Sequence, residues 1–438
     1  MRDSSVLKST LLHILRFSAA LFPLTLLPNI VVCQTQDSKA VNLTVLVTGN
    51  TFGYFDVTPV DENTAGGIVR RKTIFEQIRT EVGADKLLLL DAGNALGYYY
   101  LLRGDRGESM ISAMRALGYD AMTVGRHEFD YGKEQLRSYG DSSQNLNILC
   151  ANILDQSNAQ PFFKPFAIFE KGNGLRVAVL GLTDPRIQQT ILNRHIEGLS
   201  FSDPIGAAKT YISQLRSQAD VIIVLSHLNA ADCYKLALEV PGIDLIIARA
   251  EGSNISTVTR TEVLGTADNT LILRPEHYGT SVCRAQIRVD PARKSAVATL
   301  RNIVPVSSST PGDAEFATQL RVGAEQQYYN YSLSTFGIEP DEPLLLVDDS
   351  YTNNDLIQSL LHVMLEKTGS EIALFNNTFF RFEGVELPRY EDDPQFRKIT
   401  VRTLEQILWT DNELVSMQLT GQQLAALQRM SAAQTAAR

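Results

Sequence analysis

Stretches of apolar residues alternate with amphipathic stretches from residue 41 to about residue 250. Each apolar stretch ends in polar or small residues, as buried strands do where they leave a sheet, and the stretches between have helical spacing. Strands are expected at residues 43–49, 86–91, 121–124, 148–153, 175–183, 221–227 and 243–252. Helices are expected at residues 68–82, 107–117, 133–138, 204–217 and 231–239. The repeated order of strand, helix and strand predicts an α/β fold.

The pattern changes beyond this part. In residues 254–305 apolar and polar positions alternate, as they do in β-strands. Residues 311–333 are expected to form a linking helix. A second unit is expected to contain helices at 353–367, 403–408 and 421–430, and strands at 371–382 and 413–419. The expected domains are 41–305, a linker at 306–339 and a smaller α/β domain at 340–438. Because no element follows the last helix, the smaller domain is expected to be incomplete.

The first 33 residues differ in kind from the rest. Arg2 and Lys8 precede a long apolar stretch that is interrupted by Arg16 and two prolines. After Arg16 only 17 residues remain up to Cys33, which is short for a membrane span and suits the core of a signal peptide. Residues 1–33 are therefore expected to be an export signal, with an uncleaved anchor as the alternative. The protein is expected to be periplasmic, extracellular or membrane-anchored.

Composition narrows the class of partner. The 438 residues, of which 44% are hydrophobic, describe a globular protein of two or three domains. The 40 basic residues are outnumbered by 49 acidic ones, which argues against nucleic-acid binding and limits membrane contact to the N-terminal segment. The four cysteines have no CxxC spacing, so they predict neither a disulfide framework nor a zinc knuckle.

The stretch GRHEFDYG, from Gly125 to Gly132, carries the candidate chemistry. It directly follows the expected strand at 121–124, so His127 and Asp130 are placed at the carboxyl end of a strand, where α/β proteins position their ligands. The alternative is a helix start at which acidic side chains favour the positive N-terminal dipole. Other polar residues also end expected strands, among them Asp91, Asn94, Asn152 and His227.

In their order and spacing, these strand ends resemble the 5′-nucleotidase family of exported calcineurin-like metallophosphoesterases. The matching stretches cover nearly all of residues 41–430 and read VTGNTFG, DAGN, GRHEFDYG, CANI, VLSHLN, ARAEG, NNTFFR and LTG. The resemblance implies a two-sheet sandwich flanked by helices, followed by a smaller α/β domain. It also implies hydrolysis of nucleotides by two divalent metal ions that polarise the phosphate and activate water.

Most of the metal-binding positions that the resemblance implies are substituted. Asn50 stands where the family has its first aspartate, and Phe52 where it has a histidine. Asn94 replaces the bridging aspartate, and Arg126 replaces an asparagine ligand. Ala250 and Gly252 replace the last two ligands, so that His227 alone is retained. A neutral amide offers one carbonyl oxygen and does not offset the charge of a metal ion. No cofactor is therefore expected. Two divalent metals are expected only if the family activity is retained.

Other positions of the implied site keep polar residues. His127 and Asp130 match the family's catalytic pair, either as a working pair or as a remnant held by packing. Arg126, Asn152 and Arg381 are candidate substrate-binding residues. The guanidinium of Arg126 can bind phosphate bidentately, or it can fill the vacated space and pair with Asp130 or Glu128.

Three functions are consistent with this pattern. The first is an exported pseudoenzyme retained for binding a nucleotide or phosphate ligand or a partner protein. The second is an active 5′-nucleotidase or phosphomonoesterase with an atypical metal site at Asn50, Asn94, His127 and His227. The third is a decayed or truncated gene product.

Overall fold

The structure is a computed structural model that describes residues 40–55, 58–60, 63–97, 99–140, 145–249, 262–267, 270–290, 295–374, 385–408 and 414–436. The expected export signal at residues 1–33 lies outside this described part. Among the described helices, none is both long enough and apolar enough to cross a membrane.

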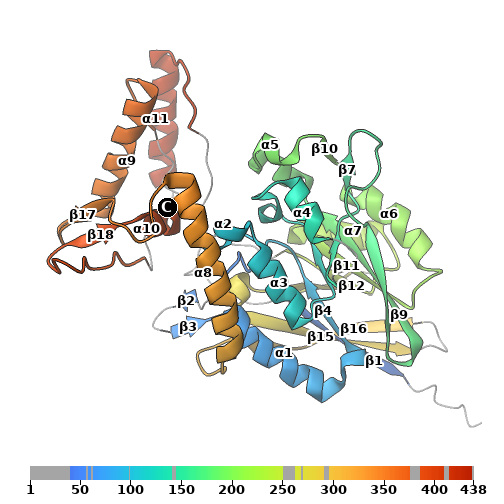
Figure 1. Ribbon diagram of the computed structural model, residues 1–438. Helices are drawn as coiled ribbons and strands as arrows, with labels where there is room; N and C mark the ends of the chain where they lie inside the picture. The colour runs from blue at the N-terminus through green and yellow to red at the C-terminus, as the bar shows by residue number, and fades with distance from the viewer. Residues whose placement is uncertain are drawn as a thin grey trace, which may run out of the picture. The chain divides into compact units, whose positions relative to one another are not determined.

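Two six-stranded sheets form the centre of the fold (Figure 1). The first has the order β16-β15-β1-β4-β5-β6, and the second the order β13-β14-β12-β11-β9-β8. The strands of the first sheet are β1 (Val41–Thr48), β4 (Leu87–Asp91), β5 (Ala121–Thr123), β6 (Asn147–Leu149), β15 (Ser281–Asp290) and β16 (Ser295–Pro305). Those of the second are β8 (Phe166–Lys171), β9 (Leu175–Thr183), β11 (Val221–His227), β12 (Leu245–Ile247), β13 (Glu262–Ala267) and β14 (Thr270–Arg274). Strands β1, β4, β5 and β6 run parallel, as do β9, β11, β12 and β14.

One apolar core lies between the sheets, because alternate residues of each buried strand point inward. It joins Val45 and Leu90 of the first sheet to Val179 and Ile223 of the second. Helices cover the outer faces, so both faces of the central strands are buried and these strands read as continuous apolar runs. The two-sheet α/β sandwich confirms the expected fold class.

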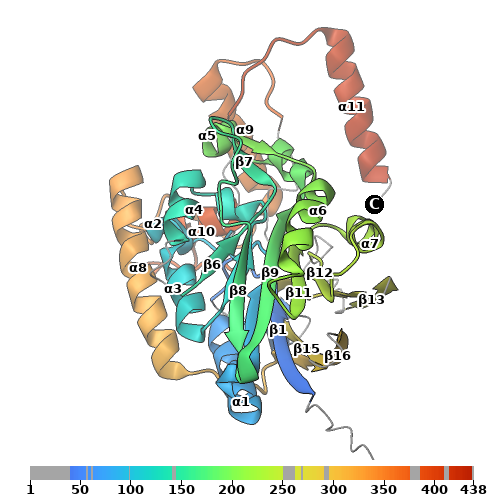
Figure 2. The ribbon, with the colours of Figure 1, turned by 90° about the vertical axis from the view of Figure 1, so that its right-hand side faces the viewer.

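Helices on the two outer faces belong to separate apolar clusters. Those on the first sheet's side are α1 (Ile68–Val82), α2 (Leu102–Asp105), α3 (Glu108–Leu117) and α4 (Lys133–Tyr139). Those on the second sheet's side are α6 (Pro204–Leu215) and α7 (Ala230–Glu239). Figure 2 shows α1 and α3 on one side and α6 and α7 on the other. The short helix α5 (Asn193–Ile196) and two small ribbons, β2 (Thr58–Val60) with β3 (Asn63–Ala65) and β7 (Ile153–Asp155) with β10 (Leu199–Phe201), complete this part.

Helix α8 (Ala314–Phe336) follows the sandwich and packs against α2 and α3. Asp313 caps its first turn by accepting a hydrogen bond from the N–H of Phe316, and Gly337 ends it at φ 71°. The remaining elements are β17 (Leu345–Val347), α9 (Asn353–Thr368), β18 (Arg397–Ile399), α10 (Val401–Ile407) and α11 (Gly421–Ala436). Strands β17 and β18 pair antiparallel.

Three strand predictions differ from the structure. The strand expected at 148–153 is divided into β6 and β7, because the N–H of Ala151 bonds to the carbonyl oxygen of Gly181 instead of continuing the ladder. No strand forms at 414–419, where Leu414, Val415 and Met417 are exposed and pair with no strand among the described residues. Of the strand expected at 371–382, residues 371–374 are irregular and the rest lie outside the described residues.

Candidate functional site

The candidate site lies where loops follow the carboxyl ends of neighbouring parallel strands. The loop after β1 carries Asn50 and Phe52, the loop after β4 carries Asn94, and the 3₁₀ turn His127–Phe129 follows β5. His227 is the last residue of β11 in the other sheet. A further 3₁₀ turn, His277–Gly279 after β14, closes the site from a position that the sequence interpretation did not identify.

The two asparagines at metal positions bind each other. Asn94 donates from Nδ2 to Oδ1 of Asn50 at 3.0 Å, and its own Oδ1 accepts the backbone N–H of His127 at 3.0 Å. Nδ2 of Asn50 lies 3.3 Å from Nδ1 of His277. Both side chains are buried. The oxygen atoms that a metal would need are therefore already engaged in hydrogen bonds.

Phe52 occupies the centre of an aromatic cluster. Its ring centroid lies 5.6 Å from that of His127, edge to face, and 6.1 Å from that of His277, stacked. Tyr278 packs at 5.3 Å. The side chain of Phe52 is only 7% exposed. An apolar ring with no donor atom thus fills the place beside the asparagine pair.

Glu128 organises the loops around this cluster, a role that was missed from the sequence. Its carboxylate accepts four backbone N–H groups, from Asn94 (2.8 Å), Ala95 (2.8 Å), Leu96 (3.2 Å) and Gly125 (2.6 Å). Burial raises the pKa of the Glu128 carboxyl to about 7, against the hydrogen bonds that favour its charged form. Because its partners are backbone groups, three of them in the loop after β4, no side-chain pattern in the sequence signalled this role.

His127 and Asp130 form the hydrogen bond expected of the family's catalytic pair. Nδ1 of His127 lies 2.9 Å from Oδ2 of Asp130. The imidazole is buried, whereas the Asp130 side chain is 34% exposed. Gly97 allows the ring to pack closely, because a β-carbon there would lie 3.1 Å from Cγ of His127. The pair can hold a proton and orient the ring.

His227 and Asp91 are buried beneath the loops. Nδ1 of His227 lies 2.7 Å from the carbonyl oxygen of Ala92, and burial lowers its pKa to about 4, so the imidazole is neutral. Asp91 accepts hydrogen bonds from Thr48 Oγ1 at 2.7 Å and from the N–H of Gly93 at 2.9 Å. Burial also raises the pKa of Asp91. Asp91 stabilises the turn after β4 through these hydrogen bonds.

The candidate substrate-binding residues differ in their surroundings. Arg126 is half-buried and, within the described residues, makes no side-chain hydrogen bond or ion pair. The pairing with Asp130 or Glu128 considered above is not formed, because His127 and the backbone N–H groups take those carboxylates. Asn152 bridges the bend after β6 by bonding to both backbone groups of Thr183 and to the oxygen of Ser202. Arg381, like positions 250–252, lies outside the described residues.

A pair of divalent metals does not fit this donor set. The family chemistry needs anionic oxygen atoms that bridge and offset two doubly charged ions. Here the corresponding positions hold two amides bonded to each other and a phenylalanine ring. Among the described residues, the neutral imidazole of His227 is the remaining ligand of the family set, and the positive charge of Arg249 further disfavours its protonation.

Comparison with known proteins shows which proteins this chain is similar to. No family model matches the chain. It is 31% identical over 220 residues to the 5′-nucleotidase of Vibrio cholerae, and 32% identical over 219 residues to protein UshA of Yersinia enterocolitica. Each match covers 49% of this chain and 39% of the relative. The chain therefore matches about two-fifths of the length of these relatives.

Solved structures show the same fold. The 5′-nucleotidase precursor of Thermus thermophilus superposes with a TM-score of 0.61 at 20% identity, covering 84% of this chain and 73% of that one. A putative 5′-nucleotidase of Staphylococcus aureus superposes with a TM-score of 0.61 at 21% identity, covering 84% and 72%. The calcineurin-like phosphoesterase YfkN of Bacillus subtilis gives 0.54 at 22% identity, covering 67% and 99%. The strand-end motifs, the sandwich and the relatives agree: over the matched part the chain is similar to the 5′-nucleotidases, and it has their fold.

Proposed function

We propose that this protein is an exported 5′-nucleotidase-like protein that lacks two-metal hydrolysis and binds a phosphorylated ligand or a partner protein. One observation carries the proposal: the asparagine pair Asn50 and Asn94, bonded at 3.0 Å, with Phe52 packed beside it. These contacts replace the charged oxygen donors on which the family reaction depends. Export rests on the apolar N-terminal stretch of the sequence.

Arg126 is the residue proposed to bind phosphate. It lies just after the carboxyl end of β5, a place called the strand mouth below. It stands at a family ligand position, is half-buried, and has no carboxylate partner within the described part of the chain. A guanidinium can replace a metal ion as a phosphate ligand because its N–H groups match two phosphate oxygens. The bound phosphate would then stay intact, since no activated water is supplied.

The second candidate function is a phosphomonoesterase with an atypical metal site. The observation in its favour is the intact pair of His127 and Asp130 at 2.9 Å, which is arranged for proton transfer to a leaving oxygen. The two functions differ in whether a phosphomonoester is turned over.

Elemental analysis of the dialysed protein, combined with a phosphomonoester assay, tests the proposal. We expect less than two equivalents of manganese or zinc and no turnover above buffer. Calorimetry with phosphate and AMP should then show binding that Arg126→Ala weakens roughly 10- to 100-fold, the loss expected for a charge-assisted contact. Two retained metal equivalents with turnover would favour the second function instead.

A further inference from the structure

A cavity of about 540 Å³ lies between the turn after α2, the turn at Asp130 and helix α8. Arg103, Arg106 and Asp130 line it, together with polar residues of α8 such as Gln327 and Asn330. Helices α2 and α8 contact each other and lie side by side in both ribbon views (Figures 1 and 2). The cavity thus joins segments that are distant in the sequence, and it is lined by neither of the paired asparagines.

Arg106 brings to the cavity a positive charge that is not held in an ion pair among the described residues. Its Nη2 donates to the carbonyl oxygen of Tyr131 at 2.8 Å, and within the described ranges it takes part in no ion pair. A guanidinium has five N–H donors, so several remain for a ligand. Arg103 differs, because the carboxylate of Glu405 lies 3.4 Å from its Nη1.

The backbone around Arg106 is held by side-chain hydrogen bonds. Arg106 has φ 59°, a left-handed conformation that is uncommon for residues other than glycine. The hydroxyl of Tyr139 donates to its carbonyl oxygen, and the carboxylate of Asp105 accepts the N–H groups of Gly107 (3.0 Å) and Ser109 (2.9 Å). A backbone fixed in this way lowers the entropy lost when a ligand is bound.

Asp130 offers an acceptor to the same cavity. Its Oδ2 bonds to His127, and among the described residues no donor reaches its Oδ1. A cation and a free carboxylate oxygen on one cavity match a ligand that carries both a phosphate and hydroxyl groups, since the hydroxyls can donate to the carboxylate.

We propose that this cavity binds a small hydroxylated phosphate monoester, with its phosphate on Arg106 and a hydroxyl on Asp130. The site is separate from Arg126 at the strand mouth and goes beyond the proposed function. The neutral amides of Gln327 and Asn330 supply further polar contacts from α8.

Calorimetry on the full chain with inorganic phosphate, ribose 5-phosphate and AMP tests this site. Arg106→Gln keeps the β-carbon, so the demand on the left-handed backbone is unchanged. We expect it to raise the Kd of ribose 5-phosphate roughly 10- to 100-fold. Arg288→Gln, an exposed arginine of β15, is the matched control and should leave the Kd unchanged.

Asp130→Asn distinguishes the contribution of the phosphate from that of the hydroxyl. Removing the negative charge should tighten inorganic phosphate binding or leave it unchanged. It should also reduce the preference for ribose 5-phosphate over inorganic phosphate, because the hydroxyl loses its charged acceptor. AMP binding as tightly as ribose 5-phosphate would identify nucleotides as the ligand source, and weaker AMP binding would identify sugar phosphates.

Two results would overturn the cavity site: no binding of any probe by the wild type, or an unchanged Kd in Arg106→Gln. If Arg126→Ala alone abolishes binding, the ligand lies at the strand mouth, so the proposed function stands and the cavity site fails. Should Arg106→Gln fail to fold in a thermal melt, Arg106→Lys replaces it. Lysine keeps the charge but loses the planar fork, so a smaller rise in Kd is expected.

Discussion

Phe52 adopts a backbone conformation that suits glycine or asparagine better than an aromatic residue. Its φ is 51°, and Asn50 and Asn94 in the same loops have φ 49° and 54°. Each such residue costs about 1–3 kcal/mol unless its surroundings hold it. Here the N–H of Phe52 bonds to the carbonyl oxygen of Asn94 at 2.9 Å, and the aromatic cluster retains the ring. The loop therefore keeps its turns although the side chains that bind metal in the family are replaced.

Replacing Phe52 separates the packing of its ring from the strain of its backbone. Phe52→Ala should lower the free energy of unfolding by about 3–5 kcal/mol, because a buried ring is lost while the strain remains. Phe52→Gly should be more stable than Phe52→Ala by about 1 kcal/mol, since glycine adopts positive φ without penalty. Urea unfolding of the three proteins measures both differences. An alanine variant at least as stable as the glycine variant would show that the backbone is not strained.

The raised pKa of Glu128 predicts that the stability of the protein depends on pH. Its folded pKa of about 7 lies above its ordinary value of 4.5, so the folded state binds a proton more tightly than the unfolded state. This contribution to stability is fully present below pH 4.5 and is lost as the pH rises towards 7, by an amount on the order of 3 kcal/mol.

Glu128→Gln isolates this contribution. Glutamine does not titrate, so the fall in unfolding free energy between pH 4.5 and pH 7 should be smaller in the variant than in the wild type. The variant should also be less stable at every pH, because its amide NH₂ faces backbone N–H donors. Urea unfolding at several pH values checks both expectations, and parallel pH profiles in the two proteins would contradict the first.

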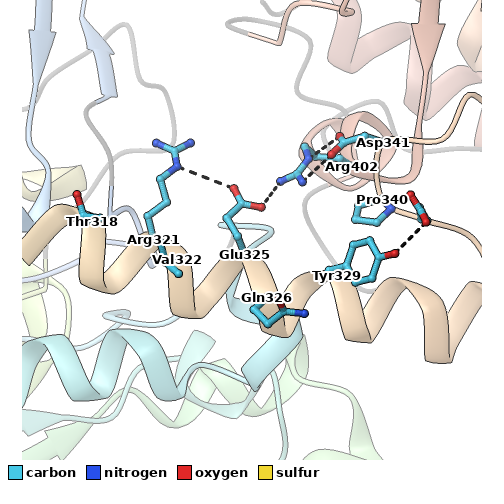
Figure 3. A pocket seen from close by; sticks show the side chains of 10 residues that line it. Thr318, Arg321, Val322, Glu325, Gln326, Tyr329, Pro340, Asp341 and Arg402 are labelled. Atoms are coloured by element: carbon cyan, nitrogen blue, oxygen red, sulfur yellow. Dashed lines mark hydrogen bonds and ion pairs between the residues drawn. The ribbon is translucent and has the colours of Figure 1, made fainter.

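Between elements, Arg402 connects α10, α8 and the segment before α2. Its guanidinium lies 2.7 Å from Asp341 and 2.8 Å from Glu325, and donates to the hydroxyl of Tyr100 at 3.1 Å. It also stacks on the ring of Tyr328, with its central carbon 5.2 Å from the ring centroid. Figure 3 shows Arg402 between Glu325 and Asp341, with Arg321 on the other side of Glu325. These contacts hold α10 against α8.

Arg402→Gln should lower the free energy of unfolding by about 1–3 kcal/mol, because it removes the charged partner that Glu325 and Asp341 share and leaves the partly buried Glu325 with only a distant arginine. Arg321→Gln is the matched control on the same carboxylate. The Arg402 side chain is 19% exposed whereas that of Arg321 is 57% exposed and lies 3.9 Å from Glu325. Replacing Arg321 should lower the free energy of unfolding by less than about 0.5 kcal/mol. Equal effects in urea unfolding would mean that burial does not set the strength of these pairs.

For the whole molecule, the two sheets bring loops together that are far apart in the chain. Residues 50, 94 and 127 arrive from the first sheet, and residues 227 and 277 from the second. The family's metal chemistry requires several loops from both sheets to supply donors at once. A change in only some of the loops therefore leaves the centre incomplete.

Restoring three family residues should not restore hydrolysis. The triple variant Asn50→Asp, Phe52→His and Asn94→Asp still has Arg126 at a ligand position, and Ala250 and Gly252 provide no donors. We expect no phosphomonoester turnover with added manganese, and less than two metal equivalents after dialysis. Thermal melts should show that the variant is folded. Manganese-dependent turnover by this variant would contradict the expectation.

The sequence by itself determined the long central strands, the order of the elements and the resemblance to the 5′-nucleotidases. Strands β9 and β11 begin and end at the predicted residues, because a strand buried on both faces is a continuous apolar run whose limits are local. The bond between His127 and Asp130 was also predictable, since they lie three positions apart in one turn. Local spacing carries this information without any knowledge of distant contacts.

Only the tertiary structure decided what the substituted site contains. The bond between Asn50 and Asn94, the four N–H groups on Glu128 and the approach of His277 to Phe52 all join loops from different strands. Their geometry depends on sheet order and loop conformation, which no sequence window records. The missing strand at 414–419 has the same cause, because an apolar alternation becomes a strand only where a neighbouring strand pairs with it.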